Sequence, residues 1–222
     1  MGATGVQARF VGDFETHVTV SCESEDDCVR ALRAWAAAEG GVKVTHVVLA
    51  RGRVQSQPML TLNGSGTLEQ QITAAEELVV GLRRGTTGCT VTRVKVEAAP
   101  WTRGVPQTDA EAASLGPGYY FEHHARILCR EADLEPLAAL VIPHGAHLSW
   151  NARRVRGDGI SERFVTQRCY GVGDASAAQA LARLRSALVE DGREILAAER
   201  EYVVYDTDAS LDEGWIRTVD GH

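Results

Sequence analysis

The chain has 222 residues, of which 44% are hydrophobic and 24% charged, so a packed globular protein of one large domain or two of about 100 residues is expected. Its formal net charge of −7 argues against non-specific binding to nucleic acid or anionic membranes, which needs surplus Lys and Arg. No apolar run approaches the roughly 20 residues of a membrane span, and the first residues show no leader pattern. With five cysteines that fit reduced thiols, these features predict a cytoplasmic protein without a membrane partner.

An ordered series of matches between the two halves of the sequence indicates an internal duplication. Residues 14–20 resemble 121–127, with Phe, Glu and His in register, and residues 59–61 resemble 164–166. Glu97 falls opposite Glu201, and the segment 45–48, which contains His46, matches 146–149, which contains His147. The spacing between matches drifts by a few residues, as loop insertions would produce.

The elements of the two halves follow the same order. In the first half, alternation predicts a strand at 13–22, and an acidic start followed by one apolar face predicts a helix that ends at Gly40. Strands at 42–50 and 57–63, a helix that begins at Thr67 and a strand at 90–99 follow. The second half gives a strand at 119–129, a helix near 133–142, strands at 146–152 and 162–170, a helix at 175–191 and a strand at 195–205.

This order predicts an α+β fold of tandem ferredoxin-like (βαββαβ) modules with antiparallel sheets. The first module spans residues 10–102 and the second 119–207. The segment 103–118 between them, rich in Gly, Pro, Ala and Ser, is predicted to be a linker. Residues 208–222 form a C-terminal tail, with Trp215 and Ile216 expected to dock back on the body.

Strand alternation also separates an apolar face of each sheet, which packs on helices, from a polar face without helices. Glu15 and His17 lie on the polar face of the first copy, and Glu122 and His124 on that of the second. The later strands add His46, Thr61, Asn63, Lys95 and Glu97 in copy one, and His147, Ser149, Asn151, Thr166, Arg168, Glu199 and Glu201 in copy two.

In a ferredoxin-like sheet the first strand lies between the third and the fourth. His17, Thr61 and Glu97 are therefore expected to be lateral neighbours, as are the corresponding residues His124, Thr166 and Glu201. If the two polar faces meet, they enclose a polar cleft with pseudo-twofold symmetry. The alternative is that these faces are solvated, or that they form an interface between the copies or in a homodimer.

Two kinds of binding suit these residues. Glu15 and His17, like Glu122 and His124, place a carboxylate and an imidazole on one strand face, and Glu97 and Glu201 would complete sites for a divalent Zn, Fe, Mn or Ni ion. Arginines would instead hold a phosphate or carboxylate; they are Arg51, Arg53, Arg153, Arg154, Arg156, Arg163 and Arg168.

Acid–base catalysis without a metal is the further option, because histidine titrates near neutrality. The segments 17–20 and 147–150 each read His, apolar, Thr or Ser, apolar. This pattern resembles the paired motifs of the two-histidine (2H) phosphoesterase superfamily, and the resemblance implies that His17 and His147 exchange protons across a phosphodiester. It covers about eight residues, and the counterpart of His17 in the repeat is His124, which Ala, Arg and Ile follow.

RNA recognition is not expected, because the middle strands carry Glu, His, Thr and Met where base-stacking aromatics would be needed. The leading hypothesis is an enzyme that acts on a small anionic molecule between the two modules, with a divalent metal as an optional cofactor. His17, His124, His147, Glu15 and Glu122 would be catalytic, Arg153, Arg168, Thr61 and Thr166 would bind the substrate, and Glu97 and Glu201 would hold any metal. The alternative is a non-catalytic ligand-binding or assembly protein.

Overall fold

The computed structural model describes residues 9–86, 88–152 and 159–215. The first half comprises β1 (Val11–Cys22), α2 (Glu25–Glu39), β2 (Lys43–Leu49), β3 (Ser56–Thr67), α3 (Leu68–Gly85) and β4 (Cys89–Ala98). The second half comprises β5 (Tyr120–Arg130), α5 (Leu134–Val141), β6 (Ala146–Asn151), β7 (Ile160–Tyr170), α6 (Asp174–Glu190) and β8 (Ile195–Asp206). Short helical turns are η1 (Glu131–Asp133), η2 (Ile142–His144) and η3 (Ala209–Asp212). The predicted mixture of helices with antiparallel strands is confirmed.

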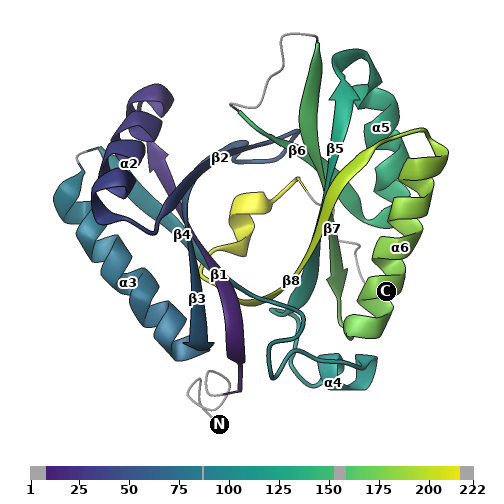
Figure 1. Cartoon of the computed structure of the whole chain (residues 1–222), viewed down its shortest axis with the longest axis horizontal. Helices are drawn as coiled ribbons and strands as arrows, with labels where there is room; N and C mark the ends of the chain where they lie inside the picture. Colours follow the sequence, from purple (N-terminus) through teal and green to yellow (C-terminus); the bar gives the residue numbers. More distant parts are fainter. Residues whose placement is uncertain (1–8, 87, 153–158, 216–222) are drawn as a thin grey trace.

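The strands close into one barrel in the order β1-β3-β2-β6-β7-β5-β8-β4 (Figure 1). Within each half, the first strand pairs with the third and the fourth, as the ferredoxin-like order requires. The halves are joined by two antiparallel pairings, β2 with β6 and β4 with β8. The sequence pattern predicts a polar cleft only if the two polar faces meet, and in the structure they are opposite walls of a single barrel interior.

The helices cover the outside of the barrel on two sides, with α2 and α3 on one and α5 and α6 on the other (Figure 1). Thr67 begins α3 with a capping box, because its side chain accepts a hydrogen bond from the Gln70 amide and the Gln70 side chain accepts one from the Thr67 amide. Gly40, with φ of 72°, ends α2 as predicted. Apolar strand residues such as Val18 and Leu60 pack with Leu32 of α2 in one outer core.

A second outer core lies under α5 and α6 and includes Ile127, Leu137, Val165, Leu184 and Leu188. A third, which contains Phe10, Phe121 and Tyr202, joins the two halves. The connecting segment contains α4 (Asp109–Ala113), and Arg103 within it forms a β-bridge with Val11. Outward-facing apolar residues thus pack against helices, while most of the residues that face the interior are polar.

The C-terminal segment returns to the barrel, where η3 lies in the centre of the ring of strands (Figure 1). The expected docking of Trp215 is confirmed: its side chain is buried, and its Nε1 donates a hydrogen bond to the Leu148 carbonyl at 3.0 Å. Arg51 Nε donates to the Trp215 carbonyl at 3.0 Å. Ile216 lies outside the described residues. We call residues 207–215 the plug, since they fill one end of the barrel interior.

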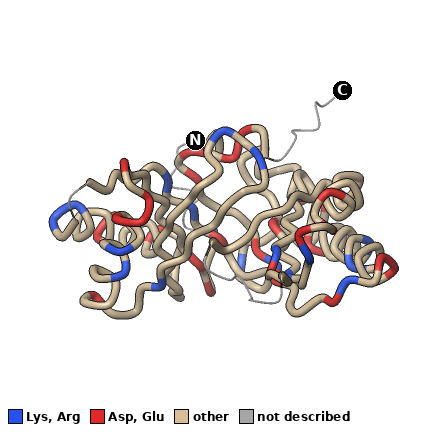
Figure 2. The backbone as a smooth tube through the Cα atoms, turned by 90° about the horizontal axis from the view of Figure 1, so that it is seen from above, with Lys and Arg blue, Asp and Glu red and all other residues tan. Residues whose placement is uncertain are grey.

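Three further findings bear on the expectations from composition. Basic and acidic residues alternate along the backbone of both halves in the described part of the chain (Figure 2), and the net charge of the chain is −7. Within the described ranges, every helix is too short or too polar to cross a membrane. The expectation of reduced thiols is wrong for two residues, because Cys22 and Cys28 form a disulfide.

Trp215→Ala should lower the free energy of unfolding by about 3–5 kcal/mol, because it empties a buried aromatic site that seals the barrel. Urea denaturation followed by circular dichroism measures this change. The matched control is Trp101→Ala, whose side chain is 77% exposed and whose removal should change stability by less than about 1 kcal/mol. Equal effects of the two substitutions would contradict a structural role for the plug.

Candidate functional site in the barrel interior

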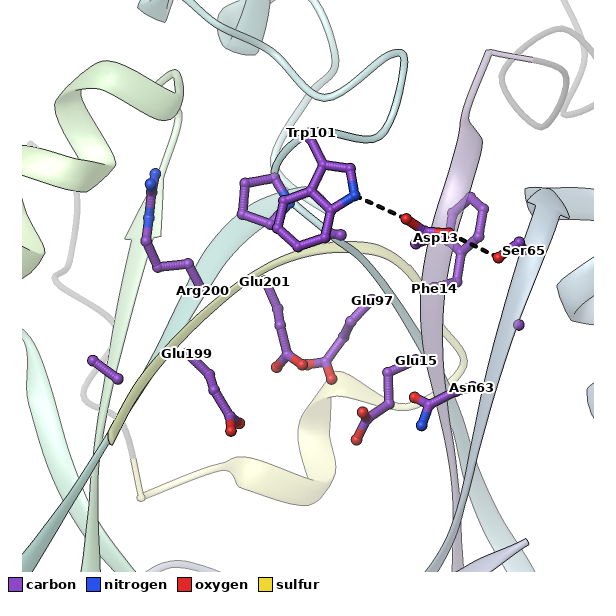
Figure 3. Close-up of a pocket in the computed structure, with 14 residues that line it drawn as sticks. Asp13, Phe14, Glu15, Asn63, Ser65, Glu97, Trp101, Glu199, Arg200 and Glu201 are labelled. Atoms are coloured by element: carbon purple, nitrogen blue, oxygen red, sulfur yellow. Dashed lines mark hydrogen bonds between the residues drawn. The ribbon is translucent and has the colours of Figure 1, made fainter. Parts of the chain in front are cut away.

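The barrel encloses a cavity of about 200 Å³ whose lining comes from both halves and from the plug. A wider hollow of about 800 Å³ lies at the end of the barrel formed by the start of β1, the ends of β3 and β4, and β8 (Figure 3). We call this hollow the mouth. Glu15, Glu199 and Glu201 line both spaces, so the mouth and the cavity adjoin.

The first half contributes a cluster around His17. Strand pairing sets His17 opposite Thr61 on β3 and opposite Lys95 on β4. The imidazole hydrogen-bonds to Thr61 Oγ1 through Nδ1 at 3.0 Å, and its Nε2 lies 2.8 Å from Glu97 Oε2 and 3.5 Å from Glu15 Oε1. The predicted contact of His17 with Thr61 and Glu97 is confirmed.

The second half repeats this cluster around His124. Its Nδ1 hydrogen-bonds to Thr166 Oγ1 at 3.0 Å, and its Nε2 lies 3.3 Å from Glu122 Oε1 and 3.5 Å from Glu201 Oε2. The predicted contact of His124 with Thr166 and Glu201 is also confirmed. In both clusters a hydroxyl holds one ring nitrogen while carboxylates approach the other, an arrangement that fixes the ring orientation.

One position breaks the symmetry between the clusters. Lys95 pairs with His17 across β4 and β1, and Glu199 pairs with His124 across β8 and β5. The two positions are equivalent, yet one carries a cation and the other an anion. The Lys95 ammonium lies 2.7 Å from Glu97 Oε1 and 2.9 Å from Glu122 Oε1, and it therefore bridges the two halves inside the barrel.

From Glu122, ion pairs of alternating sign continue to the plug. Arg168 contacts Glu122 and lies 2.7 Å from Asp212 Oδ2, and Arg93 lies 2.8 Å from the same oxygen. Arg93 also binds Asp206, with 2.5 Å between its Nη2 and Oδ2. We call this series the charge chain; its members are Glu97, Lys95, Glu122, Arg168, Asp212, Arg93 and Asp206.

The charge chain gives the equivalent residues Glu97 and Glu201 opposite electrostatic settings. Burial alone would raise the pKa of Glu97, but Lys95 and His17 outweigh it and hold that pKa well below its usual range. Burial, together with the charges of Glu97 and Glu15, raises the pKa of Glu201 well above its usual range. Figure 3 shows the two carboxyl groups turned toward one another below the mouth.

Glu122, like Glu97, is a fully buried carboxylate of the site. Burial opposes its ionisation, but Arg168 and Lys95 keep its pKa well below the ordinary value. The surroundings therefore favour the ionised forms of Glu97 and Glu122 and the protonated form of Glu201.

Other residues predicted for the site lie elsewhere or have partners already. The expectation that His46 faces the interior is wrong, because its Nε2 contacts Ser56 Oγ at 2.9 Å and Glu25 of α2 at 3.2 Å. The predicted match of His46 with His147 is also wrong. Thr61 and Thr166 are equivalent residues; Lys43 pairs with Thr61 and His147 pairs with Thr166, so Lys43 is the equivalent of His147. His147 lies 2.6 Å from Arg51 beside Trp215 and does not line the cavity. The predicted substrate-binding residue Arg153, with Arg154 and Arg156, lies outside the described residues.

Several interior residues received no role from the sequence. Arg93 is two residues before Lys95, so strand alternation places it on the interior face and its position could have been inferred. Asp212 lies in the tail, where no periodicity indicates which way a side chain points. Metal-type donor atoms of Glu97, Glu122 and His124 lie within 4.8 Å of one another, but the Lys95 ammonium already contacts both carboxylates.

Comparisons with known proteins do not assign a family. No protein-family model matches the chain, and no curated protein matches it. A mutant chlorite dismutase from Candidatus Nitrospira defluvii is similar in structure, with a TM-score of 0.32 and 9% identity over 87% of this chain and 91% of that chain. The chlorite dismutase of that organism in complex with imidazole gives 0.31 and 12% over 87% and 91%. An aspartate kinase from Synechocystis gives 0.27 and 9% over 86% and 43%. Similarities this weak carry no argument about function.

Glu201→Gln and Glu97→Gln should change stability in opposite directions. The folded state favours the protonated form of Glu201, a contribution that is complete below about pH 4.3 and is lost as pH rises through its raised pKa. Glutamine mimics the neutral acid, so Glu201→Gln should raise the free energy of unfolding at pH 8 by roughly 1–3 kcal/mol, with a smaller gain at pH 4.

Glu97→Gln leaves Lys95 short of one partner and should lower the free energy of unfolding at pH 7 by about 3–5 kcal/mol. The difference in unfolding free energy between Glu97→Gln and the wild type should shrink below about pH 4. As pH falls toward the lowered pKa of Glu97, the wild type loses the stability that the ionised carboxylate provides. Urea denaturation at several pH values measures both effects. Destabilisation of the same size by both substitutions at pH 8 would show that the two carboxyl groups share one protonation state.

Proposed function

We propose that the barrel interior binds a small molecule with a positively charged group and that Glu201 exchanges a proton with it. The observation that carries this proposal is the contrast between Glu97 and Glu201, two equivalent carboxyl groups whose pKa values are shifted in opposite directions beside one open cavity. Pairs of titratable groups separated in this way are typical of acid–base sites.

The charges around the cavity favour a cationic guest over the anionic substrate expected from the sequence. The buried cations Arg93, Lys95 and Arg168 each lie between two carboxylates of the charge chain. An anion would have to displace those carboxylates, at the cost of leaving a buried charge unpaired. By contrast, Glu15, Glu199 and Glu201 line the path from the mouth inward and present negative charge or a removable proton.

An aromatic ring at the mouth adds a second feature that suits a cation. Trp101 is 77% exposed, and its Nε1 donates a hydrogen bond to Asp13 Oδ2 at 2.8 Å (Figure 3). This bond holds the indole at the edge of the mouth, and an indole face attracts ammonium and guanidinium groups. An exposed aromatic ring beside several carboxylates would attract a cation to the mouth.

Binding and proton exchange would be coupled at Glu201. A cation that approaches Glu201 favours its ionised form, so the proton leaves the carboxyl group as the guest binds. A guest that instead requires protonation would receive that proton, with His124 Nε2 at 3.5 Å from Glu201 positioned to pass another. The chemistry is that of an acid–base enzyme; a binding protein that releases a proton on loading would use the same residues.

We also propose that the two halves arose by duplication of one βαββαβ unit, as residues 10–102 and 119–207. The equivalent clusters around His17 and His124, each closed by a threonine and two glutamates, support this origin. The Lys95 and Glu199 positions would then have diverged, and that divergence would have separated the pKa values of Glu97 and Glu201.

Isothermal titration calorimetry with tetramethylammonium and guanidinium as probes tests the proposed function. Binding should strengthen between pH 6 and pH 8, and the heat should depend on the buffer because a proton is released from Glu201. Glu201→Gln should weaken binding at least tenfold and abolish the buffer dependence. Glu77→Gln, an exposed change on α3, is the matched control and should leave both unchanged.

Phosphate, acetate and Mn²⁺ form the contrasting arms of this titration. Binding of phosphate or acetate without binding of either organic cation would overturn the proposal in favour of an anion site. Tight binding of Mn²⁺ that Glu97→Gln and Glu122→Gln abolish would replace it with a metal site.

A further inference from the structure

Three cysteines meet on the outer surface of the first half, remote from the mouth residues described above. Cys22 ends β1, Cys28 lies in the first turns of α2 and Cys89 begins β4. Cys22 and Cys28 form a disulfide, and the Sγ of Cys89 lies 3.5 Å from the Sγ of Cys22 and 3.6 Å from that of Cys28. Cys22 and Cys89 are partly exposed, so solvent thiols and oxidants reach the cluster, whereas Cys28 is buried.

From this juxtaposition we infer that the three sulfurs form a thiol–disulfide exchange site in which one disulfide moves among Cys22, Cys28 and Cys89. A thiolate at Cys89 attacks Cys22 Sγ, a new Cys22–Cys89 bond forms, and the Cys22–Cys28 bond breaks. Cys28 leaves as a thiolate and takes up the proton that Cys89 lost. Attack on Cys28 Sγ instead gives a Cys28–Cys89 disulfide and frees Cys22. Each step conserves one disulfide and one thiol, so no external oxidant or reductant is consumed.

The backbone permits both pairings of Cys22. The Cα atoms of Cys22 and Cys28 are 5.9 Å apart, within the usual range for a disulfide. Cys22 and Cys89 are directly opposed in the antiparallel pairing of β1 with β4, where Cα atoms lie about 4.5–5.5 Å apart. That spacing also lies within the range that a disulfide bridges.

The exchange would change which elements are covalently joined. The Cys22–Cys28 disulfide ties the end of β1 to α2, whereas a Cys22–Cys89 disulfide ties β1 to β4 and releases α2. The second half offers an internal comparison, because Cys129 occupies the strand position that matches Cys22 and remains a free thiol there. The exchange site is thus a property of the first half, and it does not depend on the function proposed for the barrel interior.

Counting thiols in single serine variants tests the inference. The wild-type chain has five cysteines, and the structure leaves three of them as free thiols, namely Cys89, Cys129 and Cys169. Purified, air-oxidised protein is unfolded in denaturant with an alkylating agent at low pH, and free thiols and disulfide-linked peptides are identified by mass spectrometry. Cys22→Ser, Cys28→Ser and Cys89→Ser should each retain one disulfide, always between the two remaining cluster cysteines, and show two free thiols.

The matched control is Cys169→Ser, a half-buried cysteine of the second half, which should show two free thiols and a disulfide confined to the cluster. Four free thiols in folded Cys22→Ser and Cys28→Ser, with the disulfide retained in Cys89→Ser, would overturn the inference, because Cys89 would then take no part in exchange. A stoichiometric Zn²⁺ or Cu⁺ that co-purifies under anaerobic conditions and is lost in all three variants would also overturn it, in favour of a thiolate metal site. Circular dichroism of each variant shows whether it is folded.

Discussion

The charge chain is the constraint on which the rest of the molecule depends. A buried ion costs several kcal/mol unless a partner of opposite sign and further hydrogen bonds compensate it. Here Lys95 of β4 lies between Glu97 of its own strand and Glu122 of β5, on the other half of the molecule. Closure of the barrel therefore completes the ion pairs of Lys95 and of Arg93, whose partners Asp206 and Asp212 also lie in the second part of the chain.

The same constraint explains why a repeated architecture carries an unsymmetrical site. Lys95 and Glu199 occupy equivalent places beside the two histidines, but only Lys95 supplies a cation to the carboxylates around it. The ionised form of Glu97 is therefore favoured, and its charge in turn helps to raise the pKa of Glu201. The contrast between the two carboxyl groups thus depends on a position at which the halves differ in charge, within a frame of repeated Glu and His residues.

Sequence reasoning reached the clusters but not the barrel that contains them. Period-two alternation assigned Glu15 and His17 to the helix-free face, and the strand order of a ferredoxin-like sheet predicted the contacts of His17 with Thr61 and Glu97. Both rules are local to one sheet. β2 and β6 are edge strands of their own halves, and their pairing depends on backbone hydrogen bonds. The amino-acid sequence of an edge strand therefore does not indicate which other edge it pairs with. Alignment of the two halves by residue identity also misplaced His46. By strand register the equivalent of His147 is Lys43, and these two side chains are chemically different.

The plug determines the sign of the charge that the interior offers to a guest. Asp212 is shared by Arg93 and Arg168, and Gln57 also donates a hydrogen bond to it at 3.0 Å. Without this carboxylate, two buried guanidinium groups would face the cavity with one partner fewer, and an anion would be the favoured occupant. With it in place, the arginines are satisfied, and the acidic groups near the mouth dominate what a small molecule meets on entry. In the proposed function, a short tail segment with no periodicity in its sequence therefore decides which class of ligand the barrel interior would bind.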